Sequence, residues 1–179
     1  MVLEKYNPIW INHFEAIKRE IVQVLGKHQF EIEHIGSTAV PNLDAKPIID
    51  IDIIYNDLND LAFIQSSLET IGYYHNGNQG IEHREVFKRN QDATHPILDS
   101  LKHHLYVCPT DSKALERHIL SRNYLRKNDE ARLYYQQLKY ECAERANQDR
   151  KLYQLFKEQL VNKFIDDIIA KEKKECNKY

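Results

Sequence analysis

Cysteine, glycine and proline are scarce in this sequence, and each scarcity excludes a class of protein. The three cysteines among its 179 residues, Cys108, Cys142 and Cys176, are odd in number and show no Cys-x-x-Cys spacing. This pattern argues against a disulfide framework or a zinc site and favours reduced thiols. Five glycines and five prolines are too few for a low-complexity or disordered chain. We therefore expect a compact protein with reduced cysteines.

Long apolar runs are absent as well. No stretch approaches the roughly 18 apolar residues that a transmembrane helix needs, and no apolar run follows a basic N-terminal segment. The net charge of −2 predicts no general affinity for nucleic acid or for anionic membranes. We therefore expect a cytoplasmic protein with no membrane partner, and its oligomeric state stays open.

The composition predicts one packed core. Hydrophobic residues make up 42% of the chain, which suits a single domain over residues 1–179. Acidic residues outnumber basic ones over 1–110, whereas basic residues are in excess over 111–179. We expect an α/β core over 1–110 with a helical part over 111–179 packed on it. The basic part is suited to supply phosphate ligands, although solvated helix charge explains the asymmetry equally well.

The most informative stretch covers residues 33–54 and reads EHIGSTAVPNLDAKPIIDIDII. It predicts a strand, a tight turn at Gly36-Ser37, and a second strand on which Asp50 and Asp52 share one face. Two carboxylates about 6–7 Å apart along a strand suit a hard divalent cation such as Mg²⁺ or Mn²⁺. Backbone N–H groups of a Gly-Ser turn form a nest for anions. The alternative is that both acids are simply hydrated on a solvent-facing strand.

The string HIGSTAVPNLDAKPIIDIDI resembles the signature of the GrpB-like family. The likeness continues in LSRNYLRKNDEARLYYQQLK at residues 120–139 and in the spacing of Asp149, Tyr153 and Lys157. The resemblance implies an α/β (α+β) fold similar to that of nucleotidyltransferases, with a mixed sheet flanked by helices and followed by a C-terminal helical segment. It also implies a bacterial cytoplasmic protein and a site at the Gly-Ser turn and the Asp-x-Asp pair.

The candidate site residues fall into two groups. Asp50 and Asp52 are the candidate catalytic pair. The candidate phosphate or nucleotide ligands are Gly36, Ser37, Lys46, Arg84, Arg122 and Arg126. The resemblance carries most of the preference for the arginines, because arginines four apart on a helix suit bidentate phosphate recognition but are more often solvated or salt-bridged. We expect a structural role for His34.

A strand predicted over residues 101–108 places His104 and Tyr106 on one face. Active polymerase-like nucleotidyltransferases usually carry a third carboxylate on this strand. The resemblance to the GrpB-like family implies a His-x-His pattern here instead, and this sequence departs from that pattern as well, because Tyr106 stands at the second position. The candidate metal ligands are therefore Asp50, Asp52 and His104, and an imidazole in the set also suits Mn²⁺, Fe²⁺ or Zn²⁺.

The remaining pattern predicts where helices and strands lie. Apolar spacing predicts a helix over 9–26 and another over 149–169. Three further helices are predicted by their capping residues: one from Asp57 or Asn59 to about Thr70, one from Asp111 or Ser112, and one from Asn128 or Asp129 to about Ala146. Further strands are expected near 73 and over 82–89, and the latter would carry Arg84 and Lys88 on one face. Trp10 is expected in the core. The histidines expected at the surface or in loops are His75, His83, His95 and His103.

These features predict a metal-dependent, nucleotidyltransferase-like protein that binds a nucleotide or related phosphate compound. The cofactor would be Mg²⁺ or Mn²⁺, and the acceptor is open. One alternative is a non-catalytic module for a nucleotide or a coenzyme A-type ligand, which the missing third carboxylate favours. The other is a metal-dependent phosphoester hydrolase.

Overall fold

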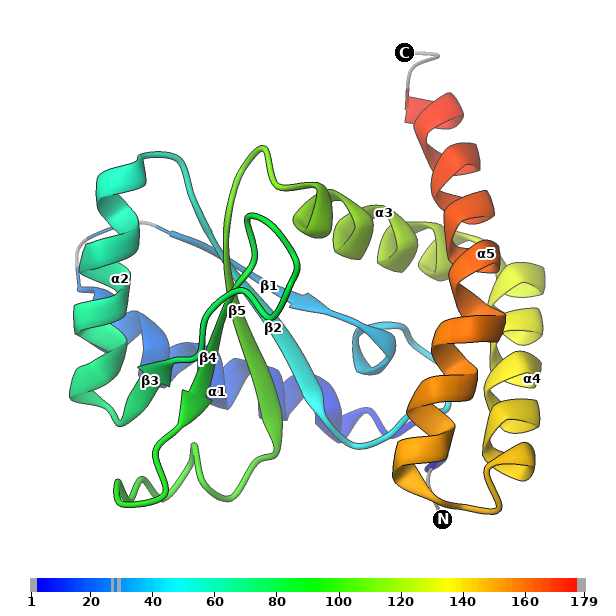
Figure 1. The fold of residues 1–179 in the computed structure, drawn as a ribbon, viewed down its shortest axis with the longest axis horizontal. Helices are drawn as coiled ribbons and strands as arrows, with labels where there is room; N and C mark the ends of the chain where they lie inside the picture. Colours follow the sequence, from blue (N-terminus) through cyan, green and yellow to red (C-terminus); the bar gives the residue numbers. More distant parts are fainter. Residues whose placement is uncertain (1–2, 27, 29, 177–179) are drawn as a thin grey trace.

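The computed structural model describes residues 3–26, 28 and 30–176, and its centre is a five-stranded sheet (Figure 1). The elements follow one another as α1 (Ile9–Leu25), β1 (Glu31–Ile35), the 3₁₀ helix η1 (Ser37–Ala39), β2 (Ile49–Tyr55), α2 (Leu58–Thr70), β3 (Tyr73–His75), β4 (Glu85–Arg89), β5 (His103–Pro109), α3 (Lys113–Lys127), α4 (Asp129–Arg145) and α5 (Arg150–Cys176). Helices α3, α4 and α5 gather beside the β1 end of the sheet (Figure 1).

The sheet is mixed, as expected. Its strand order is β1-β2-β5-β4-β3, with β2 and β5 parallel and the other neighbouring pairs antiparallel. Strand β5 therefore lies beside β2 although α2 and two strands separate them in the sequence. This arrangement confirms the predicted α+β class.

Strand β2 has one apolar face and one acidic face, because side chains alternate along a strand. Ile49, Ile51 and Ile53 are fully buried against α1, where Trp10 is only 2% exposed. Asp50 and Asp52 lie on the opposite face, and across the parallel ladder they adjoin His104 and Tyr106 of β5. The predicted faces of both strands are therefore confirmed.

The predicted helix starts are also confirmed where a side chain caps the helix. The Asp57 carboxylate accepts a hydrogen bond from the backbone N–H of Asn59 at the start of α2. The Ser112 hydroxyl accepts one from Leu115 at the start of α3. Such bonds satisfy N–H groups that a helix start leaves unpaired.

Some predicted details are wrong. Strand β4 begins at Glu85, so Arg84 precedes the strand and Glu82 lies in a turn. Tyr134, Leu152 and Leu155 lie within the predicted helices but are 50%, 46% and 48% exposed, respectively. Other side chains of the same helices fill the interfaces, including Tyr135, Tyr153 and Val161.

Two further findings concern the cysteines and the lack of long apolar runs. Cys108 and Cys142 are buried free thiols. Across residues 3–26, 28 and 30–176, no helix combines the length and the apolar character that crossing a membrane requires.

Candidate functional site

Asp50 lies where β2 meets the Gly36 turn. Its side chain is 26% exposed, and Nδ1 of His104 lies 2.8 Å from its Oδ1. Gly36 has φ of 73°, and a Cβ atom at this position would collide with Oδ2 of Asp50. A glycine is therefore needed here for two reasons: its backbone conformation and the close approach of the carboxylate.

Asp52 is fully buried and pairs with a residue from the helical part. Nδ1 of His118, on α3, lies 2.8 Å from Oδ2 of Asp52. The other carboxylate oxygen, Oδ1, is buried and has no hydrogen-bond partner among the described residues. Burial raises the pKa of Asp52, and His118 opposes that shift. An unsatisfied buried carboxylate oxygen is costly, so it marks a position suited to a ligand.

His118 was not among the residues predicted from the sequence. It lies 66 positions after Asp52, and nothing near Asp52 in the sequence points to it. The available signal was its position four residues before Arg122, which places both side chains on one face of the predicted helix.

His34 contacts residues on both sides of the Gly-Ser turn and has the expected structural role. The His34 ring stacks on Phe14 at a centroid distance of 4.7 Å, and its Nε2 lies 3.0 Å from the Thr38 hydroxyl. The Thr38 hydroxyl in turn donates to the Ile48 carbonyl at 3.2 Å. Burial lowers the pKa of His34 to about 4. The turn is thus joined both to α1 and to the start of β2.

A pocket of about 220 Å³ opens beside Asp50 and is called the Asp50 pocket below. It brings together four of the predicted residues: Ser37, Lys46, Asp50 and His104. Tyr153 and Lys157, two residues of the spacing that resembles the GrpB-like family, also line it. The remaining lining residues are Thr38, Ala45, Ile48, Tyr106, Lys139 and Gln154.

Three lysines give the Asp50 pocket its basic character. The Lys46 ammonium lies 4.2 Å from the centroid of the Tyr153 ring. Lys139 is buried and donates to the carbonyl of Asp44; burial, with Lys157 nearby, lowers its pKa. Tyr135 raises the pKa of Lys157 against the opposing effect of burial. Lys157 therefore stays protonated at neutral pH.

The three predicted arginines do not line this pocket. The Arg84 guanidinium lies 4.9 Å from the centroid of the Tyr106 ring. Arg122 is buried and pairs with Glu33 and the His34 carbonyl, whereas Arg126 donates from Nε to the Ala39 carbonyl at 2.9 Å. The two helix arginines hold the backbone that leads into and out of the Gly-Ser turn.

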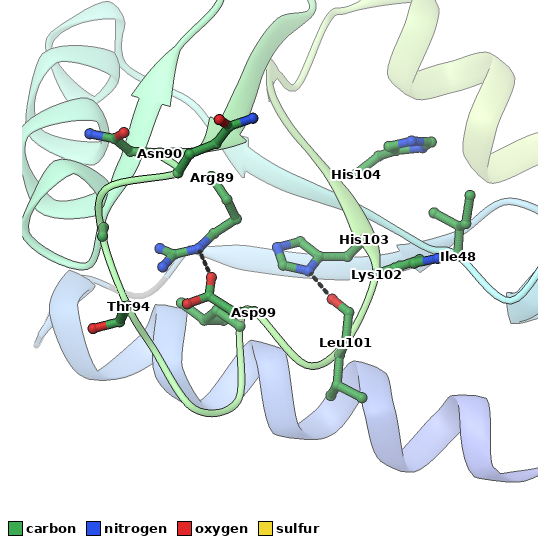
Figure 2. Close-up of a pocket in the computed structure, with 12 residues that line it drawn as sticks. Ile48, Arg89, Asn90, Thr94, Asp99, Leu101, Lys102, His103 and His104 are labelled. Atoms are coloured by element: carbon green, nitrogen blue, oxygen red, sulfur yellow. Dashed lines mark hydrogen bonds and ion pairs between the residues drawn. The ribbon is translucent and has the colours of Figure 1, made fainter.

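A larger pocket of about 610 Å³ adjoins the first and shares Ile48 and His104 with it (Figure 2). Two of its charged groups, Arg89 and Asp99, are paired: Nε of Arg89 donates to Oδ1 of Asp99 at 2.8 Å. His103 was expected at the surface or in a loop, and that expectation is wrong, because it begins β5 and is half-buried. Its ring nitrogens contact the Leu101 carbonyl and the Tyr73 hydroxyl. Burial lowers the pKa of His103.

The predicted metal ligands are only partly assembled. Asp50 and Asp52 share a face of β2, and His104 directs Nδ1 at Asp50. Within the described part of the chain, no three or more His, Cys, Asp or Glu side chains form a group suited to hold a metal ion. The oxygen donors fit a hard cation, and the unpartnered Oδ1 of Asp52 is the atom that such an ion would satisfy.

Comparison with known proteins gives the family. Residues 1–167 match the family described as GrpB protein. The glutamate-rich protein GrpB of Alkalihalophilus pseudofirmus is 30% identical over 94% of this chain and 95% of its own length. The UPF0157 protein YqkA of Bacillus subtilis is 32% identical over 77% of this chain. The chain spans only 38% of the length of YqkA.

Solved structures agree with the sequence comparison. The crystal structure of the conserved protein GrpB from Enterococcus faecalis has a TM-score of 0.77 and 30% identity, covering 95% of this chain and 98% of that one. The Cid1 poly(U) polymerase with MgGTP bound has a TM-score of 0.56 and 13% identity, covering 79% and 44% respectively. The latter confirms the nucleotidyltransferase-like fold. The chain belongs to the GrpB family.

Proposed function

We propose that this protein binds the phosphate groups of a nucleotide or related phosphate compound, together with a divalent cation, in the Asp50 pocket. One observation carries the proposal: the pocket joins the Gly-Ser turn and Asp50 to three lysines that come from the helical part and from the segment before β2. Lysines and a carboxylate that converge on one small pocket suit a metal–phosphate complex better than either ion alone.

The pocket fits phosphate groups rather than a whole nucleotide. Its volume of about 220 Å³ is smaller than the roughly 300–1,000 Å³ that is usual for sites of drug-sized ligands. In this proposal Ser37, Lys46 and Lys157 contact the phosphates, and the rest of the ligand extends toward an adjoining pocket. Lys139 lines the same pocket and donates to the Asp44 carbonyl.

Asp50 and Asp52 would hold the cation, which is Mg²⁺ or Mn²⁺ in this proposal. A bound cation of this kind neutralises charge on phosphate oxygens. The support is the choice of oxygen donors and the buried, unpartnered Oδ1 of Asp52. The similarity of the fold to a polymerase whose structure contains MgGTP points in the same direction.

In the catalytic version of the proposal, the ligand transfers a nucleotidyl group to an acceptor. An acceptor oxygen forms its bond to the α-phosphorus as the bond to pyrophosphate breaks, and the acceptor proton leaves to solvent. The protein residues align the groups and stabilise the charge of the departing pyrophosphate. A non-catalytic binding module is the second candidate, favoured by Tyr106, which lies beside Asp52 on the strand where active enzymes usually have a third carboxylate.

Titration calorimetry with tripolyphosphate and with nucleoside triphosphates, each with and without Mg²⁺, tests the proposal. Lys157→Ala should weaken the binding of every polyphosphate by about tenfold to a hundredfold, the effect of losing one charge-assisted hydrogen bond. Asp52→Asn keeps the shape of the side chain and should remove the dependence on Mg²⁺.

Lys151→Ala is the matched control, because Lys151 is an exposed lysine of the same helix outside the pocket. It should bind like the wild type. Equal losses in Lys151→Ala and Lys157→Ala, or an unchanged Mg²⁺ dependence in Asp52→Asn, would refute the assigned site. Release of pyrophosphate with a modified acceptor indicates transfer, release of free phosphate alone indicates hydrolysis, and saturable binding without turnover indicates the module.

A further inference from the structure

The face of the sheet that carries the two acids continues across β5 and β4. His104 and Tyr106 adjoin the acids on β5, and Val86 lies opposite Tyr106 on β4. Lys88 follows two residues after Val86 and therefore points to the same side. A third pocket, of about 390 Å³, lies over this region and is called the Lys88 pocket below. Its lining residues are Tyr73, Gln79, Val86, Phe87, Lys88, Arg89, His103, His104 and Tyr106.

The Lys88 pocket and the Asp50 pocket share His104 and Tyr106 as a common wall. A molecule in the Lys88 pocket therefore lies beside whatever occupies the Asp50 pocket. Two reacting groups gain most from being held next to each other in this way. The volume of about 390 Å³ also falls within the range of ordinary small-molecule sites.

The charge of the lining selects among ligands. No Asp or Glu is among the residues that line the Lys88 pocket. Lys88 is exposed, and no carboxylate of the described chain pairs with it, whereas Arg89 is paired with Asp99. The uncompensated charge that Lys88 brings to the lining of the pocket is thus positive. A cationic ligand would meet Lys88 without a carboxylate partner, and an anionic ligand would find a counter-ion.

The apolar part of the lining suits a flat, partly apolar molecule. Val86, which is buried, and the Tyr106 ring lie on the face of the sheet that carries the acids. The Arg84 guanidinium lies over the same ring at 4.9 Å from its centroid. The Tyr106 hydroxyl offers a hydrogen-bond donor and an acceptor. The Gln79 amide adds a donor and an acceptor.

From the common wall, the charge and the lining, we propose that the Lys88 pocket is the acceptor site and takes a small aromatic molecule with a hydroxyl and an anionic group. The role of the Lys88 pocket as an acceptor site rests on the function proposed above, whereas the binding of such a molecule to this pocket does not. The same charges disfavour cationic acceptors.

Two probes with the same ring and opposite charge test this proposal: 4-hydroxyphenylacetate and tyramine. Their binding is followed by changes in the ¹H–¹⁵N NMR spectrum of the labelled protein at millimolar probe concentrations. The acid should bind at least about tenfold more tightly than the amine, which is about 1.4 kcal/mol. It should shift the backbone signals of residues in β4 and β5. Lys88→Glu should abolish or reverse this preference.

Lys102→Glu is the matched control. Lys102 is exposed and lies just before β5, but it lines the 610 Å³ pocket and not the Lys88 pocket. This variant makes the same charge change nearby and should keep the preference of the wild type. Equal binding of acid and amine, no binding of the acid, or an undiminished preference in Lys88→Glu overturns the proposal.

Binding of tripolyphosphate at the Asp50 pocket and binding of the acid at the Lys88 pocket can fail independently. If tripolyphosphate binds as proposed and the acid does not, only the Lys88 pocket proposal fails. If the acid binds through Lys88 and no polyphosphate binds, the acceptor role is overturned together with the proposed function. If the acid binds more tightly than the amine at the Lys88 pocket, and tripolyphosphate binds at the Asp50 pocket of the same sample, both proposals are supported.

Discussion

At the scale of single residues, His34 is a buried base that should make stability depend on pH. Its folded-state pKa of about 4 lies below the value of roughly 6.5 for an unfolded histidine. Between these values the unfolded chain binds a proton that the folded chain does not, so stability falls as the pH falls. We expect His34 to account for a loss of about 2 kcal/mol in the free energy of unfolding between pH 7 and pH 5.

Denaturant unfolding of the wild type and of His34→Gln at both pH values measures this contribution. Glutamine does not titrate, so the variant should lose less stability than the wild type over this range, by about the same 2 kcal/mol. Parallel pH profiles for the two proteins would mean that the His34 ring does not carry the effect.

The acid pair and its faces were predictable from the sequence, whereas the partners of the acids were only partly so. Alternation along one strand places Asp50 and Asp52 together without further information. The pairing of Asp52 with His118 depends on how α3 packs, and 66 residues separate the two. Arg84 was placed on a strand that begins one residue later, at Glu85, since strand ends are the least certain part of such a prediction.

At the scale of elements, α3 is fastened to β1 by Arg122. This side chain is buried and contacts both Glu33 and the His34 carbonyl. Its removal leaves a half-buried carboxylate and a carbonyl without partners. Arg122→Ala should therefore lower the free energy of unfolding by about 2–4 kcal/mol. Tripolyphosphate affinity, measured where the variant is folded, should change little, because Arg122 does not line the Asp50 pocket.

Arg126→Ala is the comparison within the same helix, since Arg126 is exposed and makes one hydrogen bond, to the Ala39 carbonyl. Its loss of stability should be the smaller of the two. If Arg122→Ala is as stable as the wild type but no longer binds tripolyphosphate, Arg122 is instead a phosphate ligand, as expected from the sequence.

At the scale of the whole molecule, Asp44 connects the N-terminal segment and the segment before β2 to α4. Its carboxylate accepts hydrogen bonds from Lys5, the backbone N–H of Tyr6 and the Tyr140 hydroxyl. Its backbone N–H donates to Gln136 at 3.0 Å. None of this was predictable, because 38 to 96 residues separate the partners and no local pattern records such packing. The separate α/β and helical segments could be read from the sequence, but not how they are joined.

These contacts differ in burial, and that difference predicts their contributions. Tyr140 is partly buried, and its hydroxyl lies 2.6 Å from Oδ2 of Asp44. Tyr140→Phe should therefore lower the free energy of unfolding by about 1–2 kcal/mol, and Asp44→Ala by about 3 kcal/mol because the Tyr6 N–H also loses its partner. The Lys5 side chain is 83% exposed, and Lys5→Ala should show no measurable loss, since solvent screens such pairs. Denaturant unfolding ranks the three variants. A loss in Lys5→Ala as large as that in Tyr140→Phe would show that charge, rather than the buried hydrogen bonds, joins the two parts.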